Sequence, residues 1–402
     1  MTSARERGSD RLRIAVVTET YPPEINGVAN TMRQLVEGLA RRGHQMTVVR
    51  PRQHGDRRSG GASAGQVLVP GLPIPGYRGL RFGLPVYRRL RRLWGASPPD
   101  AIYVATQGPL GHAAMSAARA NHIAVLAGFH TQFQQYSRHY GLGLLTRSIM
   151  RLLRRFHNRA DATLAPTAAL GRVLHRDGFQ NVHVFSRGVD TVLFSPVRRN
   201  AALRDAWGCN GSSVVALYVG RIAPEKNIGL ALRAFDAITQ ADQDVRCVVV
   251  GDGPELGRLR ASHAEYIFTG AKVGEELAEH YASADCFLFP SLTETFGNVV
   301  TEAMASGLAV VAFDYAAAHE YIVPGQNGVV VPAGDAGAFV EAAVAVASNR
   351  DRLRNMGVRA RASAQTLSWE RAIGGVEQRL RDVVRLHSGA RGRHETLAAN
   401  TQ

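Results

Sequence analysis

The sequence predicts an α/β protein with two doubly wound, Rossmann-like domains. Its 402 residues exceed what one ordinary core supports. Short apolar runs rich in Val, Ile and Ala alternate with helical patterns along most of the chain, which is typical of parallel sheets covered by helices on both faces. A polar segment at residues 187–200, containing Gly188 and Pro196, interrupts this alternation and indicates an interdomain linker.

The N-terminal half begins with an apolar run at residues 12–18, a turn rich in Pro and Gly, and a helical pattern through Met32 and Leu39. The C-terminal half repeats the alternation after the linker. The carboxyl ends of strands in two facing sheets would border a cleft, where ligands bind in such folds. Further strands are expected at residues 46–49, 101–104, 123–126, 162–165, 182–185, 214–219, 245–250, 266–268, 286–289, 309–313 and 328–331.

These patterns predict the extent of each domain. An N-terminal domain is expected over residues 1–190 and a C-terminal domain over residues 191–365. Residues 366–386 have a helical pattern, and we expect this helix to pack back toward the N-terminal domain. Residues 387–402 are polar and rich in small side chains, which predicts a disordered tail.

The composition is that of a folded soluble protein. Hydrophobic residues make up 45% and charged residues 20%, and no apolar run approaches the roughly 20 residues that span a bilayer. The polar N-terminus has no signal-peptide pattern, so we expect a cytoplasmic protein. The three cysteines are widely separated, which argues against a disulfide framework or a close-spaced zinc motif.

The net charge of +15 indicates a polyanionic partner. A membrane surface, a nucleic acid and a phosphorylated substrate all fit the charge alone. Lys226 and Lys272 are the only lysines, so arginine supplies nearly all of the positive charge, a preference that a GC-rich genome could also produce.

Two glutamates, Glu294 and Glu302, flank the start of a predicted helix that follows the strand at residues 286–289. Backbone amides at such a helix start can hold a phosphate, and nearby carboxylates can accept hydrogen bonds from sugar hydroxyls. An isolated glutamate pair would more often be a solvated loop charge and a surface helix residue. The residues that would supply these amides are Phe296, Gly297 and Asn298.

A second loop, residues 220–227, follows the strand at residues 214–219 and carries Gly220, Arg221 and Lys226. A departing nucleotide diphosphate gains negative charge, so fixed cations would stabilise that transition state more than the ground state. Outside this context, a Gly-Arg pair with a lysine is more often a solvated loop.

The two loops, in this order, resemble those of the retaining glycosyltransferases of family 4, which have the two-domain GT-B fold with an interdomain cleft. Glu294 and Glu302 match the family's Glu-x7-Glu signature. The resemblance implies that Arg221 and Lys226 bind the donor diphosphate and that Glu294 and Glu302 contact the transferred sugar and the ribose. It also places Gly253 beside the nucleotide, Lys272 near the base and His130 near the transferred sugar or acceptor, although Lys272 could simply begin an exposed helix. Gly27 belongs to a loop that leads into a helix, so it could approach a phosphate or sugar at the positive end of that helix, or the loop could be a simple capping turn.

The resemblance further implies a metal-independent reaction on a nucleotide-diphosphate sugar, with UDP-sugars favoured and GDP-mannose next. The nucleotide-sugar is a substrate, so no cofactor is expected. Asp242 and Asp244 form an Asp-x-Asp pattern, but they precede a strand at the end opposite the expected cleft and are interpreted as a solvated turn. His130, Arg221, Lys226 and Glu294 are the expected catalytic residues.

Arginines recur beside apolar residues in two N-terminal stretches, residues 77–94 and 144–159. Such surfaces bind anionic lipid headgroups, although ordinary packed amphipathic helices show the same pattern. We expect a lipid acceptor, such as diacylglycerol or a derived glycolipid, at the inner face of the membrane, and no nucleic acid, because no nucleic-acid module is present. The membrane and acceptor residues of the first stretch are Arg78, Arg81, Arg88, Arg89, Arg91 and Arg92.

Two other functions remain open. A sugar-phosphate or glycogen synthase of the same architecture would use a soluble acceptor. A basic scaffold without enzymatic activity would explain the charge but not the combination of Arg221, Lys226, Glu294 and Glu302.

Overall fold

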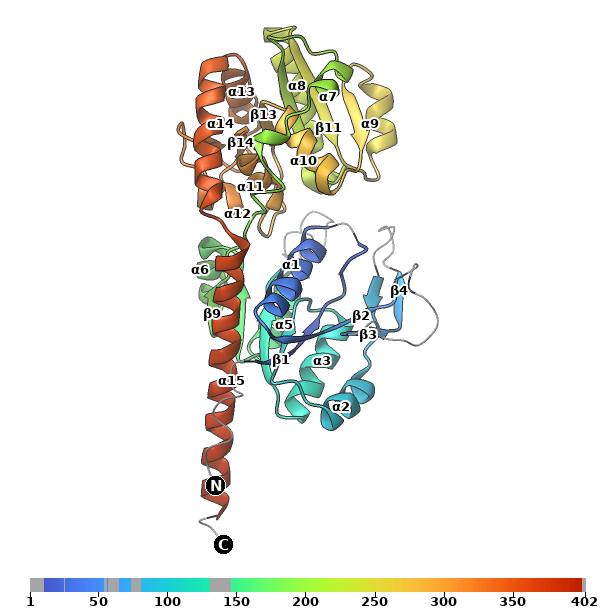
Figure 1. The fold of residues 1–402 in the computed structure, drawn as a ribbon, viewed down its shortest axis with the longest axis vertical. Coiled ribbons are helices and arrows are strands. Elements are labelled where there is room, and N and C mark those ends of the chain that lie inside the picture. Colours follow the sequence, from blue (N-terminus) through green and yellow to red (C-terminus); the bar gives the residue numbers. More distant parts are fainter. Residues whose placement is uncertain are drawn as a thin grey trace. The chain divides into compact units, whose positions relative to one another are not determined.

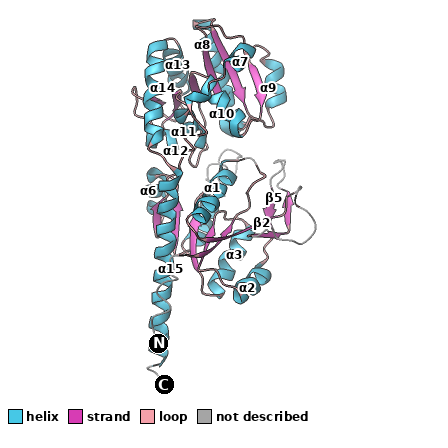
Figure 2. Cartoon of the chain, in the orientation of Figure 1, coloured by secondary structure: helices cyan, strands magenta, loops and turns pink. Residues whose placement is uncertain are grey.

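The computed structural model describes residues 11–24, 26–53, 56, 65–73, 81–130 and 146–399. These residues form two compact units. Unit 1 joins the chain up to Ser186 to the C-terminal segment from Trp369, and unit 2 comprises Arg187–Ser368. Each unit has a parallel sheet with helices around it, so the predicted α/β fold class is confirmed (Figure 2).

Unit 1 is built on a seven-stranded sheet in the order β3-β2-β1-β6-β7-β8-β9, in which all neighbouring strands are parallel. A short antiparallel pair, β4 and β5, forms a separate sheet. The elements of this part of the chain are β1 (Arg13–Val17), α1 (Gly27–Arg41), β2 (Gln45–Pro51), β3 (Gln66–Val69), β4 (Gly71–Pro73), β5 (Arg81–Gly83), α2 (Tyr87–Ala96), β6 (Ala101–Val104), α3 (Pro109–Ala120), β7 (Ala124–Gly128), α5 (Thr146–His157), β8 (Ala162–Ala165), α6 (Ala168–Arg176) and β9 (Val182–Val184).

Side chains of the central strands alternate between two cores, one on each face of the sheet. Ile14 and Val16 of β1 pack in the cluster that contains residues of α1 and α15 (Trp369–Ala399). Ala15 and Val17 pack in the cluster that contains residues of α2, α3 and α5. Both faces are therefore buried, which explains why these strands read as continuous apolar runs.

Helix α15 belongs to unit 1, where it contacts α1, β6 and β7 (Figure 1). A Cβ on Gly38 of α1 would lie 2.1 Å from the side chain of Ile373, so glycine permits the close approach of the two helices. The prediction of a disordered tail from residue 387 was wrong for residues 387–399, which continue α15 to Ala399. The helix-forming residues Ala, Arg, Glu and Leu in this segment account for the extension.

Unit 2 is built on a six-stranded parallel sheet in the order β12-β11-β10-β13-β14-β15. Its elements are the 3₁₀ turn η2 (Pro196–Arg198), α7 (Ala201–Ala206), β10 (Val214–Val219), the 3₁₀ turn η3 (Pro224–Lys226), α8 (Ile228–Ala241), β11 (Val245–Val250), α9 (Leu256–Ser262), β12 (Ile267–Gly270), α10 (Gly274–Ser283), β13 (Cys286–Phe289), α11 (Asn298–Ala305), β14 (Ala309–Phe313), α12 (Ala316–Tyr321), β15 (Gly328–Val331), α13 (Ala336–Ala347) and α14 (Arg350–Gln365).

Among the described residues, none of the helices combines the length and the apolar character needed to cross a bilayer. Strands β3, β4 and β5 were not predicted. They are three or four residues long, and only β3 joins the main sheet, at its edge. Their short sequences leave no strong periodic signal.

Candidate active site

The geometry of unit 2 brings two predicted loops together. Strands β10 and β13 are parallel neighbours at the centre of the sheet, so their carboxyl ends lie at the same edge. The loop of residues 220–227 follows β10, and the loop of residues 290–297 follows β13. This edge is where doubly wound sheets bind ligands.

Hydrogen bonds join these loops directly. The Lys226 Nζ atom lies 2.5 Å from Oε1 of Glu294, although the residues are 68 positions apart. Asn227 donates its side-chain amide to the carbonyl of Pro290 at 3.2 Å. The Thr293 hydroxyl donates to the carbonyl of Glu225 at 2.9 Å. The lysine and the first glutamate of the signature are thus held in one site.

Arg221 lies on the same loop as Lys226. Its Nη1 atom is 3.5 Å from Oε1 of the buried Glu225, while about a third of the arginine side chain, 34%, remains exposed. The buried Tyr218 hydroxyl donates to the carbonyl of Arg221 at 3.2 Å and helps to fix the main chain at this point. A partly exposed guanidinium on a fixed loop can bind the oxygens of a phosphate.

Glycines allow a third loop, after β11, to pack against the arginine loop. A Cβ on Gly251 would lie 1.9 Å from the carbonyl oxygen of Gly220, and a Cβ on Gly253 would lie 2.2 Å from that of Ile222. Gly251 also has a φ of +150°. The contacts of Gly253 therefore show a packing role, and its predicted proximity to the nucleotide stays a prediction.

The start of α11 lies beside Glu294. Gly297 precedes the helix in the left-handed conformation, with φ at 89°, so a residue without a side chain suits this position. The Phe296 side chain is buried, and the guanidinium of Arg187 lies 5.3 Å from its ring centroid. Arg187 also donates to Oδ1 of Asn298 at 3.1 Å. The positive end of this helix is a general anion site.

Arg187 is the residue of this region that sequence reasoning missed. It was included in the linker, but its side chain is buried, 5% exposed, and it contacts both Phe296 and Asn298. A lone arginine before a glycine carries no periodic or motif signal, so only the fold reveals its place.

Glu302 lies on α11 and accepts a hydrogen bond from the hydroxyl of the buried Tyr281 at 3.1 Å. Burial raises the pKa of Glu302 to about 7, and the hydrogen bond from Tyr281 opposes this rise. Glu294 is held by different contacts. Ser291 donates to its side-chain Oε1 at 3.0 Å, and Tyr315 donates to its main-chain carbonyl. The two signature carboxylates thus have distinct environments.

Lys272 follows β12 and pairs at 3.5 Å with Glu276 in the exposed first turn of α10. A role near the base remains a prediction. Asp244 lies at the amino end of β11, where it accepts hydrogen bonds from Ser212 and Ser213 at 2.8 and 2.7 Å. These contacts hold Asp244 in a hydrogen-bonded turn, and the interpretation of Asp242 and Asp244 as something other than a metal site stays a prediction.

One other group of ligand-type residues was not foreseen. Oxygen or nitrogen atoms of Asp236, His263 and Glu265 lie within 4.8 Å of one another. His263 and Glu265 precede β12, so they lie at the amino end of that strand, opposite to the edge where Lys226 and Glu294 meet. Asp236 also accepts a hydrogen bond from the Tyr266 hydroxyl. This group therefore lies apart from the candidate donor site.

In unit 1, His130 follows β7 and is buried, 4% exposed. Its Nε2 atom lies 2.7 Å from the hydroxyl of the buried Tyr103 on β6. Gly27 is the first residue of α1, where the side chain of Asn26 caps the helix by accepting hydrogen bonds from Val28 and Ala29. The capping turn considered as the alternative for this loop is therefore present.

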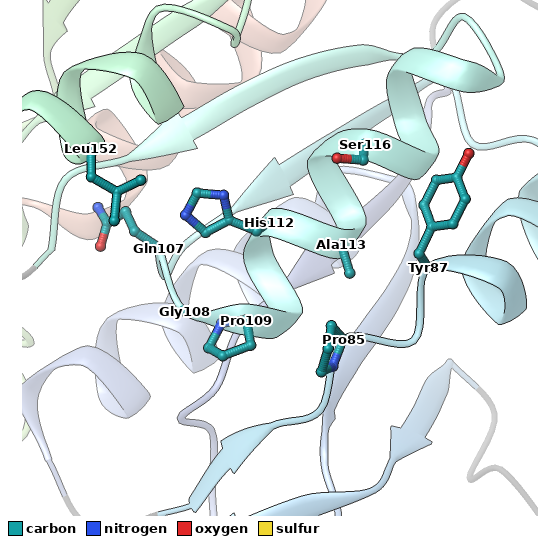
Figure 3. Close-up of a pocket in the computed structure, with 9 residues that line it drawn as sticks. All are labelled: Pro85, Tyr87, Gln107, Gly108, Pro109, His112, Ala113, Ser116 and Leu152. Atoms are coloured by element: carbon teal, nitrogen blue, oxygen red, sulfur yellow. The ribbon is translucent and has the colours of Figure 1, made fainter.

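A pocket of about 530 Å³ lies at the carboxyl end of β6 in unit 1. Figure 3 shows His112 and Ala113 of α3 along it, with Leu152 of α5 at one end and Tyr87 at the other. Pro85 and Pro109 add to its lining, which is mainly apolar. Such a pocket suits the apolar part of a small molecule.

The predicted arginine surface is only partly as expected. Arg88, Arg89, Arg91 and Arg92 are exposed on α2. Leu90 and Trp94 of the same helix are buried in the core of unit 1, as in an ordinary packed amphipathic helix. The aromatic and aliphatic face of this helix stabilises the fold.

The other two arginines of this stretch differ from those of α2. Arg81 is partly buried in β5 and donates to the carbonyl of Gly71 at 2.5 Å. Arg78 lies outside the described residues. In the second stretch, Arg147, Arg151 and Arg155 recur every fourth residue along α5 and are exposed.

Comparisons with known protein families agree with this geometry. Residues 25–193 match Glycosyltransferase Family 4, and residues 213–349 match the family described as Glycosyl transferases group 1. Within unit 2, the second match spans the loops that carry Arg221, Lys226 and Glu294.

Individual relatives extend over most of the chain. A GDP-mannose-dependent alpha-mannosyltransferase of Mycobacterium tuberculosis is 36% identical over 81% of this chain and 85% of its own. An alpha-monoglucosyldiacylglycerol synthase of Acholeplasma laidlawii is 29% identical over 79% of this chain and 84% of its own.

Solved structures share the fold. The sucrose-phosphate synthase of Thermosynechococcus elongatus aligns with a TM-score of 0.74 over 94% of this chain and 100% of its own, at 19% identity. The sequence matches and the arrangement of the donor-side loops lead to the same conclusion: this chain belongs to glycosyltransferase family 4 and is an enzyme that transfers a sugar from a nucleotide-sugar.

Proposed function

We propose that the protein transfers mannose from GDP-mannose to a lipid acceptor, with retention of anomeric configuration and without a metal ion. The observation that carries this proposal is the convergence of Lys226, Glu294 and the start of α11 at one edge of the unit 2 sheet. Arg221, on the same loop as Lys226, adds a second cation. This arrangement suits an anionic diphosphate attached to a sugar.

The donor is assigned from the relatives. The Mycobacterium tuberculosis protein, at 36% identity, is named for GDP-mannose, so we place GDP-mannose ahead of the UDP-sugars that sequence analysis favoured. The residues that contact the phosphates would serve either donor, because both contain the same diphosphate.

In the proposed reaction, the bond between the sugar C1 and the diphosphate oxygen breaks while C1 bonds to the acceptor hydroxyl on the same face. The acceptor proton passes to the departing phosphate oxygen. Arg221 and Lys226 would stabilise the charge that develops on the diphosphate. Glu294 would orient the transferred sugar, and Glu302 would accept hydrogen bonds from the ribose. The expected role of His130 stays a prediction.

The pairing of Lys226 with Glu294 gives this proposal a physical basis. Both side chains are only 16% exposed, so each charge depends on the other in the ligand-free protein. A bound diphosphate would offer Lys226 a second anion, and the hydroxyls of the sugar would offer Glu294 new donors. Donor binding would therefore provide interaction partners for both Lys226 and Glu294.

Three features support a lipid acceptor at the cytoplasmic face of the membrane. The exposed arginines of α2 and α5 attract an anionic surface. The mainly apolar pocket of about 530 Å³ could hold part of an acceptor. The relative from Acholeplasma laidlawii is named as a glycolipid synthase. Peripheral association would bring a protein of this kind to such a substrate.

The test is a donor and acceptor screen with the full chain. Thermal stabilisation is measured with GDP-mannose, UDP-glucose and UDP-galactose, and product is then sought with diacylglycerol, mixed glycolipids and soluble sugars. We expect stabilisation by GDP-mannose and an α-mannosylated lipid, with its anomeric configuration read by NMR. Efficient transfer from a UDP-sugar alone, or to soluble sugars alone, would contradict the donor or the acceptor assignment respectively.

A further inference from the structure

We propose that unit 1 contains a binding site for a phosphate-class oxyanion, formed by Arg52, Arg81 and Arg89. These residues line a pocket of about 570 Å³. They come from three elements: Arg52 follows β2, Arg81 lies in β5 and Arg89 lies in α2. A guanidinium group donates in a planar fork that matches phosphate and carboxylate oxygens.

Two of these arginines are held by uncharged partners. Arg81 donates to the Gly71 carbonyl at 2.5 Å, and Arg89 donates to the Leu68 carbonyl at 3.0 Å. A main-chain carbonyl fixes the position of a guanidinium without cancelling its charge. The pocket therefore holds two oriented cations that keep their attraction for an anion.

The aspartate that lines this pocket is already paired. Asp56 accepts two hydrogen bonds from Arg50, at 2.7 and 2.8 Å, and one from the backbone of Gln53 at 2.7 Å. The Arg50 side chain holds the pKa of Asp56 below its usual value. The positive charge of Arg50 balances this aspartate, so Asp56 does not cancel the charges of Arg81 and Arg89.

The pocket is separate from the residues assigned above to sugar transfer. It lies by β2 and β3 at one side of the sheet, whereas His130 follows β7. Three to four strand spacings separate these positions, or roughly 14–19 Å. The mainly apolar pocket at the end of β6 has a different lining that contains none of these arginines. The site rests on the proposed function only for the origin of its anion, which would be a lipid headgroup or a free phosphate ester.

The probe is inorganic phosphate, and the readout is hydrogen–deuterium exchange of the full chain at constant ionic strength. We expect phosphate to protect backbone amides of β5 and α2 in a saturable way. Arg89→Gln and Arg52→Gln should each raise the midpoint by about tenfold, as expected for one charge-assisted hydrogen bond. The matched control is Arg172→Gln, because Arg172 is exposed on α6 of the same unit but does not line the pocket.

Two further arms identify the source of the anion. Protection by glycerol 1-phosphate that Arg89→Gln weakens to the same extent would assign a free phosphate ester. Protection only by phosphatidylglycerol vesicles, again weakened in Arg89→Gln, would assign a lipid headgroup. Wild-type protein without protection at β5 and α2, or equal midpoints in Arg89→Gln and Arg172→Gln, would overturn the site. Phosphate protection of the wild-type protein tests the site even where a variant fails to fold. This measurement does not depend on sugar transfer, so a failed transferase assay would not affect its result.

Discussion

Lys226 and Glu294 show how one contact can serve both folding and chemistry. Their ion pair closes two loops that the sheet brings together. A pair with this little exposure is sensitive to removal of one partner, because the other charge stays partly desolvated. Variants at this position must therefore be compared by activity and by stability.

We expect Lys226→Ala to lower kcat by about 100-fold or more, because one oriented group that stabilises developing charge contributes that much in other enzymes. Arg221→Ala should act in the same direction. Steady-state kinetics and thermal unfolding of the same preparations measure both effects. Arg258→Ala is the control, since Arg258 is exposed in unit 2 and pairs only with a neighbour on its own helix turn among the contacts described. Turnover at the wild-type rate in folded Lys226→Ala would refute the role of the lysine.

Glu302 gives the protein a specific pH dependence. Its pKa is raised to about 7 in the folded state from 4.5, so the folded protein keeps a proton that the unfolded chain releases. The stability from this group is fully present below about pH 4.5 and is lost as the pH rises through 7. Glu19, whose pKa burial also raises to about 7, acts in the same direction.

Glu302→Gln should therefore reduce the loss of stability between pH 5 and pH 8, by on the order of 1 kcal/mol. Unfolding by urea at several pH values measures this slope. Glu341→Gln, at an exposed position of α13, is the control for removal of one carboxylate. An unchanged slope in Glu302→Gln would show that the carboxyl group ionises normally.

At the scale of elements, α2 has two faces with different roles. Leu90 and Trp94 are buried in the unit 1 core, whereas the arginines between them are exposed. Membrane contact by this helix would therefore depend on charge and not on insertion of Trp94. Electrostatic binding of this kind weakens as salt screens it.

Reversing three exposed arginines, as Arg88→Glu, Arg91→Glu and Arg92→Glu, should abolish sedimentation with anionic vesicles at low salt. Wild-type binding should fade toward 0.5 M salt, where the Debye length falls to about 4 Å. Arg352, Arg354 and Arg359 of α14 are exposed in unit 2, so their reversal is a control of equal charge. Equal loss in both triple variants would mean that only net charge matters.

At the scale of the whole molecule, we expect transfer to continue in excess EDTA. Arg221, Lys226 and the start of α11 can supply the positive charge that a divalent ion supplies in other glycosyltransferases. Initial rates with EDTA, and after addition of Mg²⁺ or Mn²⁺, measure this. Loss of activity that either ion restores would contradict the prediction and direct attention to Asp236, His263 and Glu265.

The sequence by itself determined the central sheets. The predicted strand at residues 286–289 is β13 and that at residues 245–250 is β11, because a strand buried on both faces is largely apolar. The short strand β3 at the sheet edge and the separate pair β4 and β5 carry no such requirement and were missed. The same reasoning explains the unforeseen length of α15, since a polar helix end can look like a disordered tail.

Sequence order also identified Arg221, Lys226, Glu294 and Glu302 as residues of one site, because motifs name residue types and spacings. Only the tertiary structure decided which of them meet: Lys226 reaches Glu294, whereas Glu302 contacts Tyr281. The tertiary structure also revealed the contact of Arg187 with Asn298 at the start of α11, and the pocket beside β3 that Arg52, Arg81 and Arg89 line. Such contacts join elements far apart in the chain, and parallel strand order sets their positions. No local pattern of residues encodes that order.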